Sequence, residues 1–264
     1  MAAVAFLGGA AAFGGLFDRA TAQAPVEKAA SAKAIEAFSK QQKAGIEAIV
    51  REYLLANPEI LFEVQNLLEK RAEEMQAERM KTAIKSNAEE LYRRTDAPMA
   101  GDPDGDVTVV EFFDYNCGFC KRGLSQLSKL IDNDKKVRVV LKELPILSQG
   151  SEEASRIALA AKKQGKYWEV HSALLNHRGA LDGNSAMRVA GKLGLDVEKL
   201  NKDKDSKEVT AEIEKVREIA QKMGINGTPH FLVGDRTIPG APENLYEQLA
   251  GHVKDLRENG CEVC

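Results

Sequence analysis

Residues 107–120 read VTVVEFFDYNCGFC. Residues 107–113 form a β-branched and aromatic run, which is typical of a buried strand. The run leads into two cysteines, Cys117 and Cys120, and into a helical pattern that continues to about Ile131. A second apolar run, residues 137–142, follows. We therefore predict a βαβ unit at the centre of an α/β fold.

A block of helices is predicted inside this α/β frame. Two short apolar segments, residues 231–233 and 236–238, are joined by Gly234-Asp235, which predicts a hairpin. A last helix is expected near residues 242–257. Helical patterns fill the segments between the βαβ unit and the hairpin, at about 151–177, 184–201 and 208–223.

The composition is that of a folded chain. At about 150 residues per domain, 264 residues correspond to one or two domains. Hydrophobic residues make up 44% and charged residues 29%, which excludes collagen-like, low-complexity and wholly disordered chains. The formal net charge is −3 and no long block of Lys and Arg occurs, so a nucleic acid is not an expected partner.

The N-terminus has the pattern of an export signal. Residues 2–17 are apolar and small, and Ala20-Thr21-Ala22 follows as a small-residue cleavage site, so residues 1–22 are predicted to be a signal peptide. The apolar run is shorter than the roughly 20 residues that a membrane-spanning helix needs. The alternative is a frayed, Ala- and Gly-rich terminus. Export would place the chain in an oxidising compartment where disulfides persist.

Residues 23–96 are predicted to be a helical extension. A first amphipathic helix should stop near Ala56, because Asn57-Pro58-Glu59 provides an N-cap, a proline and an acid for the start of a second helix. The second half of the second helix is polar and offers no partner to the apolar side chains of the first half. The helices must therefore pack on copies of themselves or on their own chain. Both alternatives remain open. Turn residues at 96–105 predict a boundary, with the catalytic domain over residues 97–264.

The first cysteine pair carries the predicted chemistry. Cys117 opens a helix, where unpaired N–H groups and the helix dipole favour a thiolate, the form that attacks disulfides. Cys120 lies one turn further on and would be the more buried, resolving thiol. A purely structural disulfide is an alternative. A zinc site with Cys261 and Cys264 is a weaker one, because about 140 residues separate the pairs, against 15–20 in zinc-type spacing.

Two further features surround this pair. Gly227-Thr228-Pro229 precedes an apolar strand, where a proline is normally excluded, so a cis Thr228-Pro229 bond is the hypothesis and an ordinary trans turn the alternative.

Glu111 is a lone carboxylate in an apolar strand, so a raised pKa and proton relay to the dithiol are expected, unless it faces outward near the strand end. Lys142 and Glu143 would belong to the same buried network or form a solvated rim pair.

The chain resembles the DsbA-like branch of the thioredoxin superfamily. The resemblance rests on residues 112–120, on the helical insertion and on Gly227-Thr228-Pro229, and it covers roughly residues 99–260. It implies a thioredoxin-like fold with a helical insertion and an N-terminal helical extension.

The same resemblance implies a thiol-disulfide oxidoreductase with no cofactor or metal beyond the redox-active Cys117–Cys120 disulfide. Cys117 would be the nucleophile and Cys120 the resolving cysteine. Pro229 would be the cis-proline that faces the active site, and the Thr228 backbone would pair with an incoming peptide. Glu111 matches the buried acid beneath the dithiol.

Two departures bear on the reaction. Gly118-Phe119 replaces the Pro-His of strongly oxidising members, and Thr228 replaces their Val, as in bacterial disulfide isomerases. Residues 53–59, YLLANPE, resemble the extension of the ScsC-type proteins (suppressor of copper sensitivity), some of which oligomerise through it. The resemblance thus implies a periplasmic, trimeric isomerase that acts on unfolded or misoxidised exported proteins and is kept reduced by a membrane thiol reductant of the DsbD/ScsB type. The alternative is a monomeric dithiol oxidase with a DsbB-type oxidant.

The chain ends in a second pair, Cys261-Glu262-Val263-Cys264. A cap-like disulfide or an exposed redox pair is expected there. A soft thiolate pair also binds Cu(I), so a copper-binding or copper-stress protein is a hypothesis from another class. His230, next to Pro229, is a candidate for lining the active-site groove.

Overall fold

The computed structural model describes residues 37–261. The predicted signal peptide, residues 1–22, and Cys264 lie outside these residues. The chain divides into two compact units, Met1–Arg71 and Ala72–Cys264.

The first unit contains α2 (Lys40–Ala56) and the start of α3 (Glu59–Ser86). Helix α2 begins at a capping box in which the Ser39 hydroxyl accepts from the Gln42 N–H and the Gln42 side chain accepts from the Ser39 N–H. The break between the helices lies where the sequence predicts it. The predicted role of Asn57 as an N-cap is wrong, because its side chain donates to the Tyr53 carbonyl, 2.8 Å away, and so closes the end of α2.

The apolar side chains of this unit are mostly exposed, in agreement with the prediction that the stripe of the second helix finds no partner in its own segment. Two of them, Phe62 and Ile49, are 69% and 68% exposed. The other large exposed side chains on α2 and the first part of α3 are Ile46, Val50, Tyr53, Leu55, Leu61, Val64, Leu67 and Leu68.

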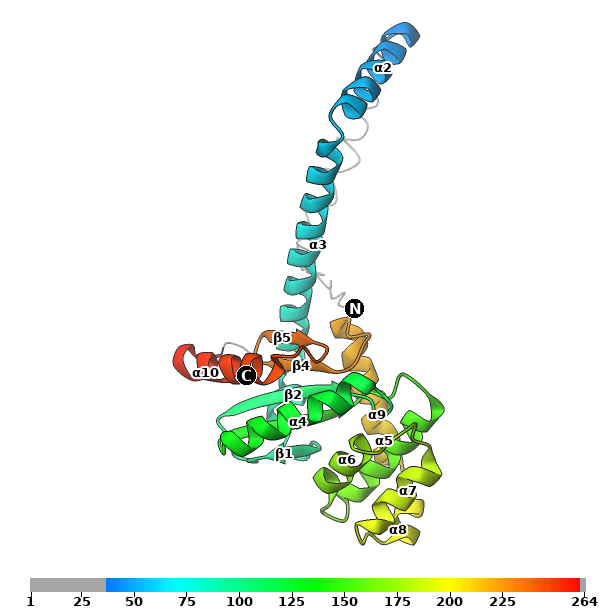
Figure 1. Ribbon diagram of the computed structural model, residues 1–264, viewed down its shortest axis with the longest axis vertical. Coiled ribbons are helices and arrows are strands. Elements are labelled where there is room, and N and C mark those ends of the chain that lie inside the picture. The colour runs from blue at the N-terminus through cyan, green and yellow to red at the C-terminus, as the bar shows by residue number, and fades with distance from the viewer. Residues whose placement is uncertain (1–36, 262–264) are drawn as a thin grey trace, which may run out of the picture. The chain divides into compact units, whose positions relative to one another are not determined.

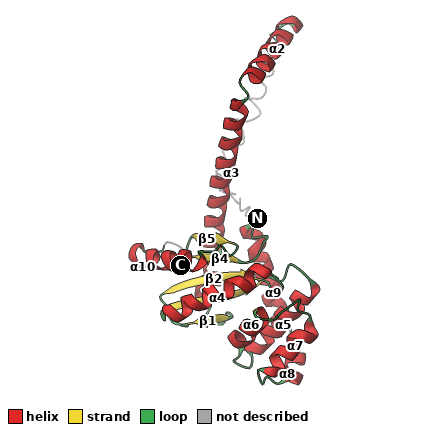
Figure 2. Cartoon of the chain, in the orientation of Figure 1, coloured by secondary structure: helices red, strands yellow, loops and turns green. Residues whose placement is uncertain are grey.

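The second unit is built on a five-stranded mixed sheet (Figures 1 and 2). The strand order is β1-β3-β2-β4-β5, in which β2 and β3 are parallel and the other neighbours are antiparallel. The strands are β1 (Met99–Gly101), β2 (Val107–Phe113), β3 (Val137–Glu143), β4 (His230–Val233) and β5 (Arg236–Pro239). The predicted βαβ unit and hairpin are therefore confirmed.

Helices surround this sheet, and those between β3 and β4 form the predicted insertion. The helical elements after α3 are the π-helix η1 (Glu89–Arg93), α4 (Gly118–Asn133), α5 (Gln149–Lys162), α6 (Tyr167–Leu175), α7 (Gly183–Lys192), α8 (Val197–Asp203), α9 (Lys207–Met223) and α10 (Leu245–Asn259). The α/β fold with a helical block is thus confirmed. Two predicted long helices are each divided, because Gly165 and Gly194 adopt a positive φ between α5 and α6 and between α7 and α8.

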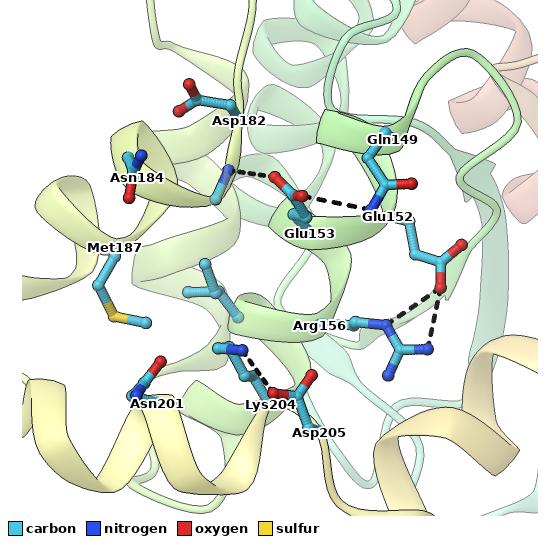
Figure 3. A pocket seen from close by; sticks show the side chains of 12 residues that line it. Gln149, Glu152, Glu153, Arg156, Asp182, Asn184, Met187, Asn201, Lys204 and Asp205 are labelled. Atoms are coloured by element: carbon cyan, nitrogen blue, oxygen red, sulfur yellow. Dashed lines mark hydrogen bonds and ion pairs between the residues drawn. The ribbon is translucent and has the colours of Figure 1, made fainter.

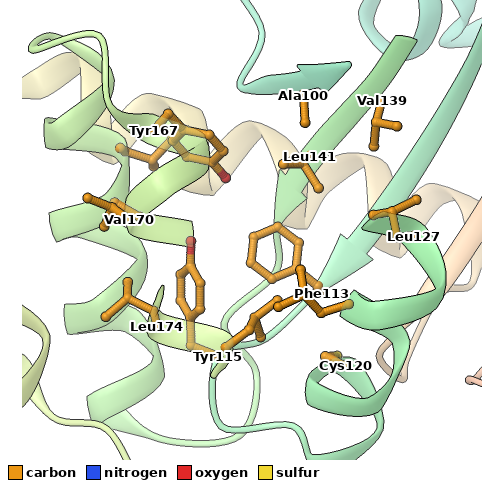
Figure 4. Close-up of a cluster of buried hydrophobic side chains, with 14 of the residues drawn as sticks. Ala100, Phe113, Tyr115, Cys120, Leu127, Val139, Leu141, Tyr167, Val170 and Leu174 are labelled. Atoms are coloured by element: carbon orange, nitrogen blue, oxygen red, sulfur yellow. The ribbon is translucent and has the colours of Figure 1, made fainter. Parts of the chain in front are cut away.

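Side chains of β2 alternate between two apolar layers. Val109 and Phe113 pack with α4, α10 and the inserted helices, whereas Val110 and Phe112 pack with α3, η1 and α9. Figure 4 shows Phe113 in the first of these layers, with Cys120, Tyr115 and the insertion's Tyr167 around it. The sheet therefore separates the layer of the cysteines from the layer of the chain's earlier helices.

Residues 72–96 belong to the second unit. Ile84 and Leu91 are fully buried in the layer that contains Val110 and Phe112, and the Tyr92 hydroxyl donates to the Gly234 carbonyl. The compact unit begins at Ala72, earlier than the predicted boundary at residue 97. The turn residues at 96–105 only flank β1, a short edge strand that the sequence pattern did not predict and that pairs with β3. Among the described residues, no helix is both long and apolar enough to cross a membrane.

Replacing Leu91 tests this assignment. Leu91→Ala should lower the free energy of unfolding by about 2–5 kcal/mol, because Leu91 is fully buried and its removal leaves a cavity. Denaturant unfolding of the whole chain measures the change. Leu147→Ala is the control, since Leu147 is 55% exposed, and it should change stability by less than about 0.5 kcal/mol. Equal effects of the two variants would show that residues 72–96 are not part of the folded core.

Candidate active site

Cys117 caps the start of α4. Its backbone is extended, with φ −76° and ψ 116°, and its sulfur accepts a hydrogen bond from the Cys120 N–H at 3.3 Å. Cys117 is 5% exposed and Cys120 is fully buried, and both are free thiols. The two sulfurs therefore take the predicted positions, one at the helix terminus and one a turn behind it.

The pKa values of the two thiols are shifted in opposite directions. Hydrogen bonds from the Cys120 thiol, from the Thr228 side chain and from the backbone N–H groups of residues 119 and 120 lower the pKa of Cys117 to about 6. Burial and the neighbouring Cys117 raise the pKa of Cys120 far above its ordinary value. At neutral pH the outer sulfur is thus a thiolate and the inner sulfur a thiol, which is the division of roles that thiol-disulfide exchange requires.

The loop between α9 and β4 brings a backbone carbonyl to Cys117. Helix α9 ends at Met223, and the next residue, Gly224, has a φ of +70°, which only a glycine adopts readily. The Thr228-Pro229 peptide bond is cis, which confirms the hypothesis drawn from the sequence. In the thiol form, Cys117 donates to the Thr228 carbonyl oxygen at 3.1 Å. The dithiol and the Thr228-Pro229 segment are therefore adjacent.

Glu111 is buried on the face of β2 that it shares with Val109 and Phe113. It is 1% exposed, and neither carboxyl oxygen has a hydrogen-bond partner among the described residues. Burial raises the pKa of Glu111 to about 8, and the negative charges of Cys117 and Glu143 add to this effect. The outward-facing alternative is wrong, since Glu111 pairs with Leu141 and Phe231 in the middle of the sheet.

Lys142 and Glu143 are both buried, so the solvated rim pair is wrong. Successive residues of a strand face opposite sides of the sheet, and only Glu143 lies on the side of Glu111. The Lys142 ammonium instead donates to the Glu90 carbonyl at 2.8 Å and lies 3.3 Å from the Glu90 carboxylate. One shared network of all three residues is therefore excluded.

Glu143 lies at the centre of a polar cluster that the sequence analysis missed. Its Oε1 accepts from the hydroxyls of Tyr115 at 2.9 Å and Tyr167 at 2.7 Å, and the Tyr115 hydroxyl lies 3.3 Å from His171 Nδ1. Figure 4 shows both tyrosine rings directed into the same part of the core. Burial raises the pKa of Glu143 to about 8, although the tyrosine hydroxyls act against this. A second carboxylic acid is thus kept protonated near the dithiol face.

Asp114 and Asn116 fix the turn that leads into Cys117. Asp114 accepts from the N–H groups of Asn116, Ile146 and Leu147. The Asn116 side chain both donates to the Leu181 carbonyl and accepts from the Leu181 N–H. An Asx residue two positions before another, directly after a strand, was the sequence signal for this bracing turn.

Two of the hollows in the second unit bear on the site. One, of about 1110 Å³, is lined by Phe119 and by the segment from Thr228 to His230, together with residues of α3. The predicted position of His230 is thereby confirmed. The other, of about 530 Å³, lies among the inserted helices (Figure 3). Polar side chains such as Glu153, which accepts from the Gly183 N–H, line it, and it contains no thiol. Neither lining includes Cys117 or Cys120, but Phe119 and Thr228, which line the first hollow, lie next to Cys117, so the first hollow is the one beside the dithiol.

Within residues 37–261, no group of three or more His, Cys, Asp or Glu could hold a metal ion. Cys261 is disulfide-bonded and lies against the β4–β5 turn, with its sulfur 3.1 Å from the position that a Cβ on Gly234 would take. In this state Cys261 offers no thiolate to a soft metal.

Comparison with known families now places the chain. The DSBA-like thioredoxin domain matches residues 108–253, more than half of the chain, and the "Copper resistance protein ScsC N-terminal domain" matches residues 42–74. The chain therefore belongs to the DSBA-like thioredoxin domain family of thiol-disulfide oxidoreductases. The fold and the family expected from the sequence are confirmed, including the ScsC-type extension.

Solved structures and curated proteins agree with this placement. A thioredoxin-like oxidoreductase from Silicibacter pomeroyi is 45% identical, with a TM-score of 0.62 over 64% of this chain and 97% of that one. A linker-deletion mutant of ScsC from Proteus mirabilis is 29% identical, with a TM-score of 0.64 over 84% of this chain and 98% of that one. The thiol:disulfide interchange protein DsbA of Bordetella parapertussis is 28% identical over 62% of this chain and 81% of its own length.

Some curated relatives are much longer than this chain. The Na(+)/H(+) antiporter NhaA 3 of Salinispora tropica is 30% identical over 147 residues, which are 55% of this chain. This chain spans about a fifth of the length of that relative, 22%.

The pKa of Glu111 predicts how stability changes with pH. The pKa in the folded protein, about 8, is above the ordinary value of 4.5, so ionisation of Glu111 opposes folding and stability falls as pH rises through this interval. Glu111→Gln removes this decline. The reduced variant should therefore be more stable than the parent, by an amount that grows from about pH 5 to pH 8, at most ~1.4 kcal/mol for each pKa unit.

Denaturant unfolding of both reduced proteins at several pH values measures this difference. Glu243→Gln, at an exposed carboxylate, is the control and should change stability by less than about 0.5 kcal/mol at every pH. A Glu111→Gln variant that is no more stable than the parent at pH 8 would contradict the raised pKa.

Proposed function

We propose that this chain is an exported protein thiol-disulfide oxidoreductase of the isomerase or reductase type, which acts on unfolded or misoxidised exported proteins through Cys117 and Cys120. The observation that carries the proposal is the state of Cys117, whose sulfur caps α4 and has a pKa of about 6 while the buried Cys120 stays protonated. The thiolate is the form that attacks a disulfide.

The proposed reaction consists of two substitutions at sulfur. The Cys117 thiolate attacks one sulfur of a substrate disulfide, forms a mixed disulfide and releases the other substrate sulfur as a thiolate. In reduction, Cys120 loses its proton and attacks the Cys117 sulfur, which releases the second substrate thiolate and leaves a Cys117–Cys120 disulfide. Two electrons pass to the substrate. In isomerisation, a substrate thiolate attacks the mixed disulfide instead, so that Cys117 leaves as a thiolate and no net electrons are transferred.

We assign the proton of Cys120 to Glu111. Both Glu111 oxygens lack partners, and Glu111 lies on the sheet face covered by α4. A carboxyl group with a pKa of about 8 is ionised in part at neutral pH and can accept a proton there. Pro229 and Thr228 are assigned to the substrate side, because the Thr228 carbonyl lies against the Cys117 sulfur.

The acidity of Cys117 favours an isomerase or reductase over a strong oxidant. A strongly oxidising dithiol has a nucleophile with a pKa of about 3.5, whereas a reducing one has a value of about 7. The value of about 6 for Cys117 is closer to the reducing end. Gly118-Phe119 between the cysteines offers no imidazole to stabilise the thiolate further. We keep the monomeric oxidase, served by a DsbB-type oxidant, as the second candidate.

The proposal includes assembly, location and a partner. The exposed apolar side chains of α2 and the start of α3 suit contact with copies of this chain, and we propose a homotrimer formed through residues 37–71. Several dithiols would then act on one substrate. The export signal predicted from the sequence supports a periplasmic location, where a membrane thiol reductant of the DsbD/ScsB type would keep Cys117 reduced.

Single cysteine substitutions test the chemistry. Cys117→Ala should abolish reduction of a peptide disulfide, because the attacking thiolate is lost. Cys120→Ala should accumulate the mixed disulfide, since no internal thiol resolves it, and the adduct is measured by mass spectrometry under non-reducing conditions. The rate of adduct formation should rise with pH with a midpoint near 6, following the pKa of Cys117. Turnover by Cys117→Ala would refute the proposed role.

Removal of the first unit separates the two candidate functions. The whole chain should have the solution mass of a trimer and should reactivate a scrambled substrate protein, whereas a chain that starts at Ala72 should be a folded monomer that still reduces small disulfides. Light scattering coupled to size exclusion measures the mass. A monomeric whole chain that rests as the Cys117–Cys120 disulfide would favour the oxidase.

A further inference from the structure

The hollow beside the dithiol has a wall that neither the dithiol helix α4 nor the Thr228-Pro229 segment provides. Three segments of the second unit line it: residues 224–230, which lead into β4; residues 237–242, from β5 and the loop that follows it; and residues 72–80 of α3. Phe119, from the turn between the two cysteines, is 54% exposed and also lines it. The hollow, about 1110 Å³, is therefore a groove between the dithiol loop and a helix that precedes the sheet in the sequence.

The α3 wall is fixed in place by its own contacts. Met80 is 8% exposed and packs in the same apolar layer as Met223 and Ile225, which flank the end of α9. One turn earlier, the Gln76 amide lies 3.2 Å from the position that a Cβ on Gly224 would take. This part of α3 thus rests directly against the loop that continues to Thr228.

The lining of the groove is mainly apolar and carries charge at one point. Ala72, Ala77, Met80 and Ile225 contribute apolar side chains, and Glu73 is the one Asp, Glu, Lys or Arg among the residues that line it. His230 adds no charge at neutral pH, because burial lowers its pKa to about 4. No ion pair within the described residues uses Glu73. The groove therefore presents one negative charge in a mainly apolar surface.

The position of Cys117 indicates what occupies the groove. A protein captured as a mixed disulfide is tethered at the Cys117 sulfur, 3.1 Å from the Thr228 carbonyl, and Thr228 itself lines the groove. Residues next to the captured cysteine therefore lie within reach of this surface. A folded substrate buries most of its large apolar side chains and rarely exposes a contiguous apolar patch, whereas an unfolded segment offers both.

We propose that residues 72–80 of α3 form a substrate-binding wall, and that Glu73 is a specificity-determining residue that favours unfolded segments with Lys or Arg near the reacting cysteine. This inference rests on the proposed function. An exposed charge pair contributes up to about 1 kcal/mol, which corresponds to a rate preference of about two- to fivefold at low salt. The preference should weaken as salt is added, because exposed charges are screened.

Matched peptides test the role of Glu73 in the whole chain. Two peptide disulfides differ only in a Lys or a Glu a few residues from the cysteine, and the rate of mixed-disulfide formation with each is measured in the Cys120→Ala background. The Lys peptide should react about two- to fivefold faster, and Glu73→Lys should reverse the order. Glu78→Lys makes the same change of charge on the same helix, outside the groove, and should leave the preference unchanged.

A steric variant tests the wall independently of charge. Ala77→Trp places a large side chain in the groove and should slow both peptides at least fivefold, while the reaction with hydroxyethyl disulfide, which is too small to reach α3, stays unchanged. Failure of the parent protein to react with hydroxyethyl disulfide would refute the proposed function itself. Normal reaction with that reagent, together with unchanged peptide rates in Glu73→Lys and Ala77→Trp, would refute only the substrate wall.

Discussion

The sulfur of Cys117 must lie at the first turn of α4 and against the carbonyl of Thr228 at the same time. These two residues are 111 positions apart in the sequence, so the contact depends on the whole sheet between them. Strands β2 and β4 are antiparallel neighbours, and Phe112 lies opposite His230. The end of β2 leads to the dithiol, and the start of β4 follows Pro229. These two strand ends therefore lie side by side at the same end of the sheet. The helical insertion can vary in length without changing this geometry, because it leaves the sheet after β3 and returns before β4.

The two faces of the sheet differ in whether their buried ionisable side chains have charged partners. On the α3 and α9 face, the buried ammonium of Lys142 is compensated by Glu90, and Arg94 bonds to Glu90 and Glu212. On the dithiol face, Glu111 has no partner and Glu143 has only neutral hydroxyls. A paired buried ion has a fixed protonation state, whereas an unpaired buried acid can gain or lose a proton at neutral pH. The face that carries out thiol chemistry is thus the one where protons can move.

Local sequence signals predicted much of the fold. The β-branched run before Cys117, the Asn57-Pro58 break and the Gly234-Asp235 hairpin each depend on neighbours in sequence, and each was located correctly. Contacts over long distances were not predictable in this way. Strand β1 is too short to have a pattern, and it exists because β3 offers it an edge. Whether Lys142 and Glu143 share a network was also undecided from the sequence, since it depends on which layer covers each face of β3.

The candidate site shows the same division. The spacing of the cysteines and the apolar strand around Glu111 predicted the reacting groups, because those features are local. The α3 wall could not be predicted, since its residues lie more than 30 positions before the dithiol and have the composition of a solvated helix.

Helix α3 is also the reason why the extension and the catalytic unit cannot be separated at the turn-rich segment before β2. It is one continuous helix from Glu59 to Ser86, yet Met80 and Ile84 belong to the core beneath β2 and β4. A cut after residue 96 would remove these core residues together with one side of the groove. A cut at Ala72 retains the core residues and this side of the groove. Residues 72–80 line the groove, and the buried Met80 and Ile84 lie at the end of this segment and just after it. The helix that begins in the first unit therefore ends as a structural part of the site, and any exchange of extensions between relatives must keep its second half with the catalytic unit.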